Sequence, residues 1–399
     1  MPNQAPNTKY QAQKSILLLA PHPFFQARGT PIAVDLLLRV LSRHGHRVDV
    51  VTYREGAGRE YDGVSIYRIP PIPFVRNIRP GFSVKKIICD LFLAAKAARM
   101  AKLNKYDLIH AVEESVFIAM RIKNSRGIPY IYDMDSSMPD QVAEKCRLFR
   151  PLLPWMKRRE KQALLGAEDV AAVCEELAGI ARAAGARRVT VLKDVSLLGV
   201  YSSGGADAPE LESSTERTTF MYIGNLEKYQ GIDLLIESFA KARRKDDAME
   251  LILAGGTPSD IDKYRRKAGK LGLQDEIRFV GPKPIEHMAS LFKAADVLVS
   301  PRITGTNTPM KIYSYLDSGK PLLATDLPTH TQVLNGRVAA LAPPEPGAFA
   351  KEMVNLASDR QRAADLAAAA KSLARSQYSF DHFEQSVLKL FAAGDAGGQ

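Results

Sequence analysis

The sequence has few cysteines and no long apolar run. Its three cysteines, Cys89, Cys146 and Cys174, are far apart in a chain of 399 residues. Three scattered thiols do not form a disulfide framework or a cysteine metal cage, which favours a reducing compartment. No stretch approaches the roughly 18 apolar residues of a membrane span, and the apolar run 16–20 is too short for a signal peptide. We therefore expect a cytoplasmic protein, either fully soluble or peripheral to the inner face of the membrane.

The positive charge is concentrated in two stretches. The formal net charge is +11, yet residues 76–105 hold eight Lys or Arg and one acidic residue, and residues 145–161 hold seven and one. The rest of the chain is thus slightly acidic. Local basic patches of this kind bind a polyanion or an anionic membrane face. With 46% hydrophobic and 25% charged residues the chain is of ordinary globular composition, which excludes disorder.

Short runs of β-branched and leucine residues alternate with helical patterns along the chain. This alternation predicts βαβ units around parallel sheets. Helical patterns near the end cover 348–374 and 380–393. The predicted strands are 15–20, 47–53, 64–70, 108–112, 130–134, 169–174, 188–193, 219–224, 249–255, 277–281, 297–301, 321–325 and 338–342.

Two similar halves are predicted, joined by a stretch rich in Gly, Ser and Glu. The linker covers 197–217 and lacks hydrophobic periodicity. The first domain is predicted at 1–196 and the second at 218–376, with a terminal helix at 377–399.

The loop after the first strand has the features of a helix start that can bind an anion. Gly29 permits close backbone approach, Thr30 suits an N-cap, and Pro31 suits the first helical position. The following helix, 32–43, would offer free N–H groups to a ligand. A plain capped turn is the alternative.

The loop after the fourth strand of the second half repeats this pattern with more charge. Thr308 is the predicted N-cap and Pro309 the first helical residue, with Lys311 one turn into the helix. Arg302 adds a second cation and Gly305 a flexible backbone. We predict a diphosphate site here, and one such loop per domain suggests a shared cleft. A solvated cap with incidental charges is the alternative.

These segments resemble the family 4 glycosyltransferases. The residues YIGNLEKYQGIDLL at 222–235 are similar to the strand, loop and helix that open the donor domain of that family. The residues NTPMKIYSYLDSGKPLLAT at 307–325 match its next conserved segment, and the loop 23–32 resembles its Gly-rich acceptor loop. The resemblance implies the GT-B fold, an α/β architecture of two doubly wound Rossmann-like domains facing across a cleft. It also implies a last helix that crosses back to the first domain.

The same resemblance implies a retaining reaction with no cofactor and no obligatory metal, in which a nucleotide diphosphate sugar is the co-substrate. At the positions of two family glutamates this chain has Thr306 and Ser314. Asn225 and Gln230 replace an Arg and a Lys, and Asp135 replaces a His. These differences leave the diphosphate to Arg302, Lys311 and helix N-termini. The resemblance assigns catalysis to Asp135, Arg302 and Lys311, and donor binding to Gly224, Asn225, Gln230, Gly305, Thr306, Asn307, Thr308 and Ser314.

Polar residues at the strand ends of the first half predict the acceptor side. Asp133 and Asp135 are interpreted as a carboxylate pair that orients acceptor hydroxyls, with a metal site as the alternative. His110 and Glu113, at the end of the fourth strand, either line the acceptor site or belong to an acidic helix start. The acceptor-side residues are Arg28, Gly29, Thr30, His110 and Glu113.

The basic stretch contains an amphipathic helix. We expect its apolar stripe to pack on the first domain. The stripe consists of Val84, Ile87, Ile88, Leu91, Phe92, Ala95 and Ala98. A second hypothesis is an anionic membrane surface as partner of residues 76–105, contacted by Lys85, Lys86, Arg76, Arg79 and the loop 80–82. Nucleic acid is not expected, because no interleaved aromatics accompany the charge.

The leading functional hypothesis is transfer of a sugar from a nucleotide diphosphate sugar to a glycan, a lipid-linked acceptor or another hydroxyl. A catalytically degenerate GT-B protein that binds nucleotide or glycan is one alternative. A nucleotide-sugar epimerase on the same fold is another, but it would need acid–base side chains around the sugar, and the loop 305–311 offers none.

Overall fold

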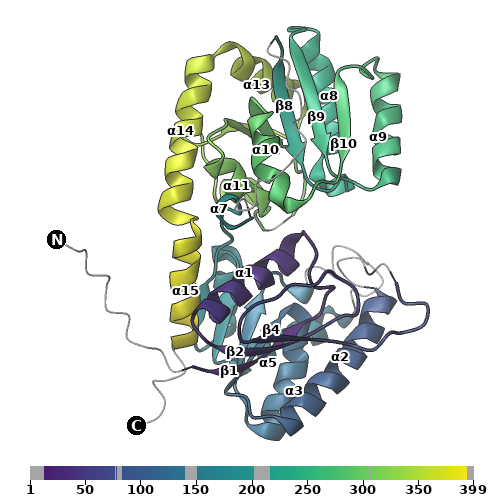
Figure 1. Ribbon diagram of the computed structural model, residues 1–399. Coiled ribbons are helices and arrows are strands. Elements are labelled where there is room, and N and C mark those ends of the chain that lie inside the picture. Colours follow the sequence, from purple (N-terminus) through teal and green to yellow (C-terminus); the bar gives the residue numbers. More distant parts are fainter. Residues whose placement is uncertain are drawn as a thin grey trace, which may run out of the picture. The chain divides into compact units, whose positions relative to one another are not determined.

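The structure of the chain is a computed structural model that describes residues 13–76, 78, 83–139, 151–201, 216–305 and 307–392. It consists of two α/β units (Figure 1). The first comprises residues 1–193 together with 384–399, and the second comprises 194–383. The predicted linker differs at its start, because Leu198–Tyr201 form helix α7 within the second unit. Residues 202–215 of that linker lie outside the described residues.

The first unit contains a parallel sheet in the order β3-β2-β1-β4-β5-β6-β7. Leu18 in the central strand pairs with Val50 on one side and His110 on the other. The strands are β1 (Ser15–Ala20), β2 (Arg47–Thr52), β3 (Val64–Arg68), β4 (Leu108–Val112), β5 (Tyr130–Met134), β6 (Asp169–Ala172) and β7 (Val189–Val191). The helices are α1 (Gly29–Arg43), α2 (Val84–Leu103), the short η1 (Glu113–Ser115), α3 (Val116–Arg126), α5 (Leu153–Gly166) and α6 (Glu175–Ala184).

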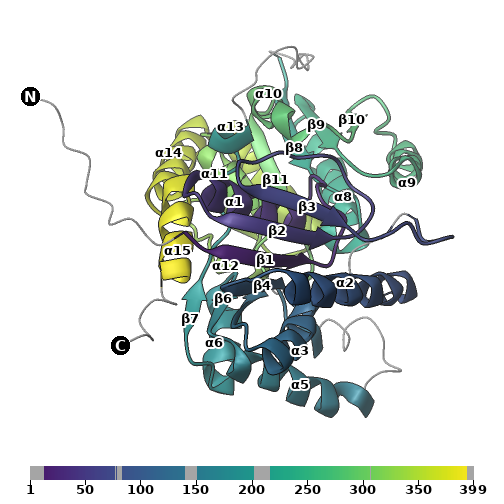
Figure 2. The same ribbon diagram turned by 60° about the horizontal axis from the view of Figure 1, so that its bottom comes forward.

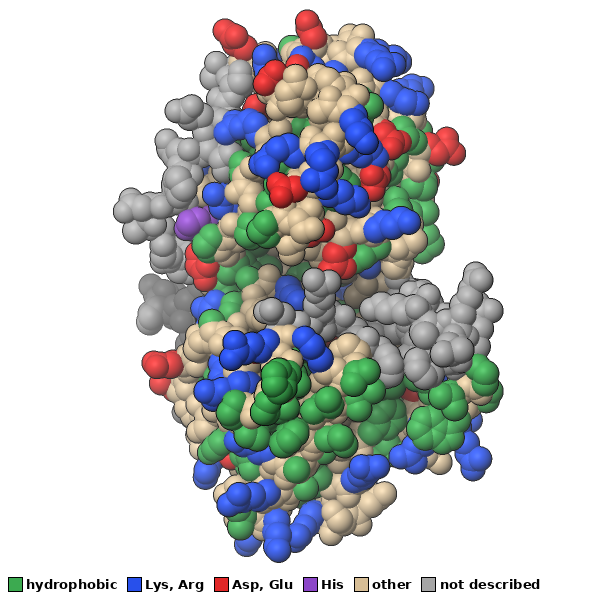
Figure 3. All heavy atoms as spheres, turned by 90° about the vertical axis from the view of Figure 1, so that its right-hand side faces the viewer, with side chains coloured by type: hydrophobic (Ala, Val, Ile, Leu, Met, Phe, Trp, Pro, Cys, Tyr) green, Lys and Arg blue, Asp and Glu red, His purple; other side chains and the backbone are tan. Residues whose placement is uncertain are grey.

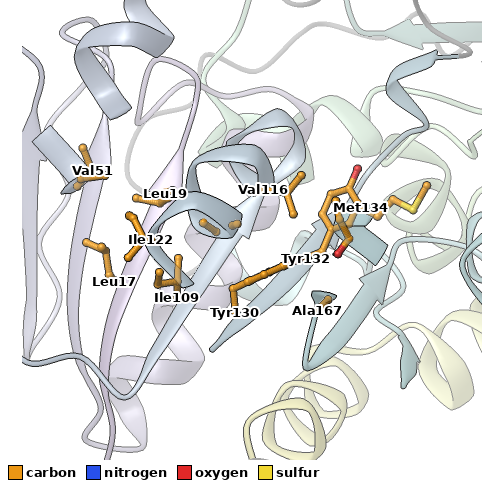
Figure 4. Close-up of a cluster of buried hydrophobic side chains, with 14 of the residues drawn as sticks. Leu17, Leu19, Val51, Ile109, Val116, Ile122, Tyr130, Tyr132, Met134 and Ala167 are labelled. Atoms are coloured by element: carbon orange, nitrogen blue, oxygen red, sulfur yellow. Dashed lines mark hydrogen bonds between the residues drawn. The ribbon is translucent and has the colours of Figure 1, made fainter. Parts of the chain in front are cut away.

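Both faces of this sheet are covered, which explains why its central strands read as continuous apolar runs. Leu17, Leu19 and Ile109 point to the face on which α2, α3, α5 and α6 pack (Figure 4). Helices α1 and α15 (Phe380–Ala392) lie on the other face (Figure 2).

The second unit has the same architecture. Its parallel sheet has the order β10-β9-β8-β11-β12-β13. The strands are β8 (Thr218–Ile223), β9 (Met249–Ala254), β10 (Ile277–Gly281), β11 (Val297–Ser300), β12 (Leu322–Thr325) and β13 (Ala340–Ala342). The helices are α7, η3 (Lys228–Gln230), α8 (Ile232–Arg243), α9 (Pro258–Lys270), η4 (Ile285–His287), α10 (Met288–Lys293), α11 (Lys311–Asp317), α12 (Pro328–Thr331), α13 (Pro346–Ser358) and α14 (Arg360–Gln377).

Two buried clusters hold this unit together. One joins the sheet to α8, α9 and α13, and the other joins its opposite face to α10, α11 and α14. Every predicted strand is present, with its ends within two residues of the prediction. The single helix predicted at 348–374 is instead two helices, because the Asp359 side chain caps Arg362 N and starts α14 there.

The predicted orientation of α2 is wrong. Its buried residues are Cys89, Leu93, Ala97, Met100 and Ala101, which lie on the opposite side of the helix from the predicted stripe. Val84 and Leu91 of that stripe are 72% and 65% exposed. The reason is that α2 has two apolar sides, and the one with smaller side chains packs against the sheet. No helix among the described residues is long and apolar enough to cross a membrane.

The end of α15 belongs to the first unit, as the resemblance implied. Phe391 is buried and its ring stacks on His110 at 5.8 Å between centroids. His110 therefore does not stand at the strand end as predicted. It is the middle residue of β4, fully buried, with Nε2 2.9 Å from Asp133 Oδ2.

Replacing Phe391 by Ala should destabilise the first unit by about 3–5 kcal/mol, the usual cost of truncating a buried phenylalanine. Urea denaturation followed by circular dichroism measures the loss. Gln385→Ala, an exposed position on the same helix, is the control. Equal midpoints for the two variants would show that α15 does not contribute to the core of the first unit.

Candidate functional site

The two sheets place their ligand-binding loops by the same topology. In each, the strand order reverses beside the first strand, between β1 and β4 and between β8 and β11. Loops at the carboxyl ends of strands that flank such a reversal diverge, and ligands bind there. The predicted residues of both halves follow these four strands.

In the second unit the loops after β8 and β11 contact each other. Ile303 N donates to Tyr229 O over 3.0 Å, which ties one loop to the other. Gly224, with φ 148°, has no room for a side chain, because a Cβ there would lie 3.0 Å from the Tyr222 hydroxyl and 3.3 Å from Lys311 Nζ. Gly305, with φ 133°, is equally constrained, since its Cβ would overlap the Arg302 guanidinium.

Lys311 brings its ammonium group to the Gly224 loop. Nζ lies 3.8 Å from the centroid of the Tyr222 ring and donates to Gln230 Oε1 over 3.2 Å. Burial, reinforced by the positive charge of Arg302, lowers the pKa of Lys311 well below its usual range. The amide and the aromatic face compensate only part of the lost hydration.

Arg302 is the second buried cation of this site. Its Nε donates to Thr304 O over 2.7 Å, one terminal nitrogen donates to Asn307 Oδ1 over 3.3 Å, and the guanidinium lies 5.3 Å from the Tyr229 ring centroid. Burial lowers the pKa of Arg302, but an arginine stays charged. These contacts shape the loop 302–307 around the cation.

No carboxylate among the described residues pairs with either cation. Thr308, in the same loop, is buried, and its hydroxyl has no hydrogen-bond partner in the described part of the chain. Two buried cations without a counter-ion, together with an unsatisfied hydroxyl, indicate a site that is completed by an anion.

Side chains from β12 and α12 hold this loop, two through its main chain and one through the Ser300 hydroxyl. Thr325 Oγ1 donates to Arg302 O over 2.5 Å, and Thr329 Oγ1 donates to Asn307 O over 2.7 Å. His330 Nε2 lies 2.9 Å from Ser300 Oγ. The loop is thus fastened at both ends by residues that need not touch the ligand.

The hydrogen bonds define the state of His330. Since Thr325 gives its proton to Arg302 O, the His330 Nδ1, 2.9 Å from Thr325 Oγ1 and 3.0 Å from Thr325 O, carries the proton. Nε2 then accepts from Ser300. Burial lowers the pKa of His330 to about 3, with Lys311 and Arg302 adding to the effect, so the ring is neutral at ordinary pH.

The helix start differs from the prediction. Helix α11 begins at Lys311, preceded by Met310, and Thr308 makes no capping hydrogen bond. Lys311 is thus the first helical residue and not one turn in. The turn starts at Pro309, whose carbonyl accepts from Ile312 N over 2.9 Å.

Two of the predicted donor-binding residues, Ser314 and Asn225, use their side chains within the protein. Ser314 is buried and accepts from Leu197 N over 3.0 Å, so it holds the start of the second unit. The amide of Asn225 is used within its own turn, donating to the Tyr229 hydroxyl and accepting from Glu227 N. Thr306 lies outside the described residues.

In the first unit, the end of β4 carries an acidic turn. Glu113 has φ 49°, a left-handed conformation that is uncommon for a residue with a side chain and that tends to occur at functional sites. The Ser136 hydroxyl, after β5, donates to its Oε1 over 3.5 Å. Glu114 next to it forms an ion pair with Lys86, which also donates to Pro21 O over 3.1 Å after β1.

A buried cluster beside this turn was not predicted. Asp90 accepts from the Tyr53 hydroxyl at the end of β2, and burial raises the pKa of Asp90 to about 6, opposed by Lys86. Lys86 was predicted on a basic surface. Its contacts with Pro21 and Glu114 turn it inward instead. The sequence signal for this cluster was weak, because its residues come from three separate elements.

The other predicted acceptor-side residues lie at the start of α1 and after β5. Gly29 begins α1, and Thr30 is the second helical residue and not its N-cap, which is Arg28. Arg28 donates to Ile78 O over 3.3 Å. Asp135 directly follows β5, whereas Asp133 is bound to His110, so the two carboxylates do not act as a free pair.

The fold and the loop sites at both reversals are those of a glycosyltransferase with the GT-B fold. The sequence profile described as "Glycosyl transferases group 1" matches residues 217–359, and that of the "Glycosyl transferase 4-like domain" matches residues 28–193, together more than half of the chain. The chain belongs to the family 4 glycosyltransferases.

Relatives and solved structures agree with this assignment. The chain is 23% identical to an alpha-monoglucosyldiacylglycerol synthase of Streptococcus pneumoniae over 79% of its length and 72% of that protein. It is 29% identical to a D-inositol 3-phosphate glycosyltransferase of Corynebacterium efficiens over 65% of its length and 66% of that protein. A sucrose-phosphate synthase of Thermosynechococcus elongatus superposes with a TM-score of 0.78 at 18% identity, covering 97% of this chain and 100% of the other. Anabaena HepE in complex with UDP has a TM-score of 0.73 at 17% identity, with coverages of 95% and 100%.

The neutral His330 predicts acid sensitivity. Its pKa is about 3 when folded and about 6.5 when unfolded, so the unfolded state binds more protons between these values. Stability is complete above pH 6.5 and falls as the pH drops below it, by at most about 1.4 kcal/mol per pH unit. Urea denaturation at pH 7 and pH 5 should show a smaller loss for His330→Gln than for the wild type.

The matched control is His287→Gln, a partly exposed histidine of the same unit. If His287→Gln reduces the acid sensitivity as much as His330→Gln does, the buried network around His330 is not its origin.

Proposed function

We propose that the second unit binds the diphosphate of a nucleotide sugar through Lys311 and Arg302, with Gly224, Gly305 and Thr308 forming the surrounding loops. The observation that carries this proposal is the pair of buried cations without a carboxylate partner at the reversal between β8 and β11. An anion with two negative phosphates supplies the missing counter-charge. The solved structure of HepE in complex with UDP supports a uridine nucleotide as the first donor to test.

The proposed reaction retains the configuration of the sugar. The bond between the anomeric carbon and the diphosphate oxygen breaks, and the acceptor oxygen forms its bond to the same face of that carbon. Negative charge develops on the departing diphosphate, and the hydroxyl proton of the acceptor is transferred to it. Lys311 and Arg302 stabilise this charge from fixed positions, so little reorganisation is needed as the bond breaks.

We propose the acidic strand ends of the first unit as the acceptor side. Glu113 and Asp135 follow neighbouring strands, β4 and β5, and their carboxylates can accept hydrogen bonds from sugar or polyol hydroxyls. The names of the two relatives, which refer to a glucosyldiacylglycerol and to an inositol phosphate, support a lipid-linked or polyol hydroxyl as acceptor.

The same site favours transfer over epimerisation and over metal-assisted transfer. Epimerisation needs acid–base groups around the donor sugar, and the loop 305–311 contains no Asp, Glu or His. Protein cations occupy the place that a divalent ion would have at the diphosphate, so we propose activity without metal or cofactor.

We also propose a site of action at the cytoplasmic face of a membrane. Cys89 is a free thiol, in keeping with a reducing compartment. Nucleic acid is not proposed as a partner, because the basic stretches do not belong to a recognisable nucleic-acid-binding module.

A nucleoside diphosphate should bind at least about 10-fold more tightly than the corresponding monophosphate, because the second phosphate meets Lys311 and Arg302. Calorimetry with UDP and UMP, then with guanosine and adenosine pairs, measures this ratio and identifies the base. Equal affinities for every pair would refute the diphosphate site.

Lys311→Ala should lower kcat/KM for glycosyl transfer about 100-fold or more, as expected for removal of one group that stabilises the transition state. Thermal stability without ligand should stay the same or rise, because the folded state no longer holds a buried ammonium whose pKa is depressed. Product release with and without a chelator is measured alongside melting.

Lys228→Ala, an exposed lysine in the loop after β8, is the control and should keep wild-type turnover. A Lys311→Ala variant with normal turnover and a lower melting temperature would make Lys311 a structural residue.

A further inference from the structure

Helix α2 exposes a second apolar side that nothing in the described chain covers. Val84 and Leu91 are 72% and 65% exposed, and Ile87 and Phe92 are also exposed. These residues recur at helical spacing and so share one side of α2, opposite to Cys89, Leu93 and Ala97 in the core. Single exposed apolar residues are ordinary, but a contiguous patch marks an interaction surface.

Two neighbouring segments extend this surface. Phe74, in the loop before α2, is 97% exposed, and Lys85 Nζ donates to Arg76 O over 2.8 Å, which holds that loop at the start of α2. Trp155 near the start of α5 is 62% exposed. We call Phe74, Val84, Ile87, Leu91, Phe92 and Trp155 the outer apolar face.

The helices of this face form one layer. Helix α2 contacts α3, α3 contacts α5, and all three pack on the same side of the sheet (Figure 2). Figure 3 shows hydrophobic side chains gathered over the lower part of the molecule, with Lys and Arg around them and few acidic side chains.

Both helices expose several cations, whereas the single acid of each helix points inward. Helix α2 exposes Lys85, Arg99 and Lys102, while its single acid, Asp90, is bound to the Tyr53 hydroxyl in the interior. Helix α5 repeats this arrangement. It exposes Lys157, Arg158 and Lys161, while its single acid, Glu160, is buried and accepts from Ser137 Oγ and Met138 N over 3.2 and 3.0 Å.

We propose that the outer apolar face docks on the surface of an anionic lipid bilayer. Its apolar side chains enter between the headgroups, and the surrounding Lys and Arg bind lipid phosphates. An apolar strip bordered mainly by cations is complementary to such a surface, where negative charge lies at the same level as accessible hydrocarbon. A protein partner would have to combine an apolar patch with an acidic border. The docking surface does not depend on the proposed catalytic site, whereas the choice of a lipid-linked acceptor rests on docking and the proposed function together.

The experiment is sedimentation of the full chain with phosphatidylcholine vesicles that contain either no phosphatidylglycerol or about a third of it. The wild type should bind the anionic vesicles at least 10-fold more strongly, and salt should weaken this binding. Ile87→Ser with Leu91→Ser should lower the partition coefficient at least 10-fold. Lys85→Glu with Arg99→Glu should do the same on anionic vesicles. Arg266→Glu with Lys270→Glu, two exposed cations of α9, is the matched control and should stay within twofold of the wild type.

Trp155 is the single tryptophan of the chain and therefore reports insertion directly. Its emission should shift to the blue on anionic vesicles and be quenched by brominated lipid chains. Binding that is equal on neutral and anionic vesicles, or that both α2 double variants leave unchanged, would overturn the proposal. So would concentration-dependent dimerisation that Ile87→Ser with Leu91→Ser abolishes, since the occupant would then be a second copy. If the wild-type protein binds anionic vesicles but shows no transferase activity, the proposed function is wrong and the docking surface still stands.

Discussion

The second unit holds two buried cations, Lys311 and Arg302, in a loop site where none of the described carboxylates pairs with them. Lys311 lies against the ring of Tyr222 and the amide of Gln230, and Arg302 is held by the carbonyl of Thr304. Neither contact neutralises the charge. The nearby polar side chains of Thr325, Thr329 and His330 bind the backbone or one another. They hold the loop in place and do not bind the cations. The loop is therefore held in place by hydrogen bonds, while its cations remain available to a ligand. Such a site suits stabilisation of a negative charge that develops during the reaction.

The first unit uses the same topology for the opposite electrostatics. At its reversal, Glu113 and Glu114 follow β4, and the one nearby lysine, Lys86, is paired with Glu114. One parallel sheet thus presents cations and the other presents carboxylates at equivalent strand ends. These are the two sites that we propose for a phosphate-bearing donor and a hydroxyl-bearing acceptor.

In α2 and α5, the packing of the core determines which side chains are left on the surface. Helix α2 could bury either of its apolar sides, and it buries the one with Ala97 and Ala101. Small side chains allow close approach of a helix to the sheet, so the larger Leu91 and Phe92 are left outside. The acids of α2 and α5 turn inward to satisfy buried donors, which leaves the outer surface with one sign of charge.

The sequence by itself determined the strands and the two-domain α/β class, because these depend on local hydrophobic periodicity. It also singled out Arg302 and Lys311 in the loop after a predicted strand, and the structure brings Lys311 to Gln230. Only the tertiary structure decided which side of α2 is buried, that His110 stacks on Phe391, and that Ser314 binds Leu197. Each of these depends on the shape of a distant segment packed against the residue. Hydrophobic periodicity shows that one side of a helix is apolar, but the segment packed against the helix determines which of two apolar sides is buried. The same packing determines which polar atoms remain available to a ligand.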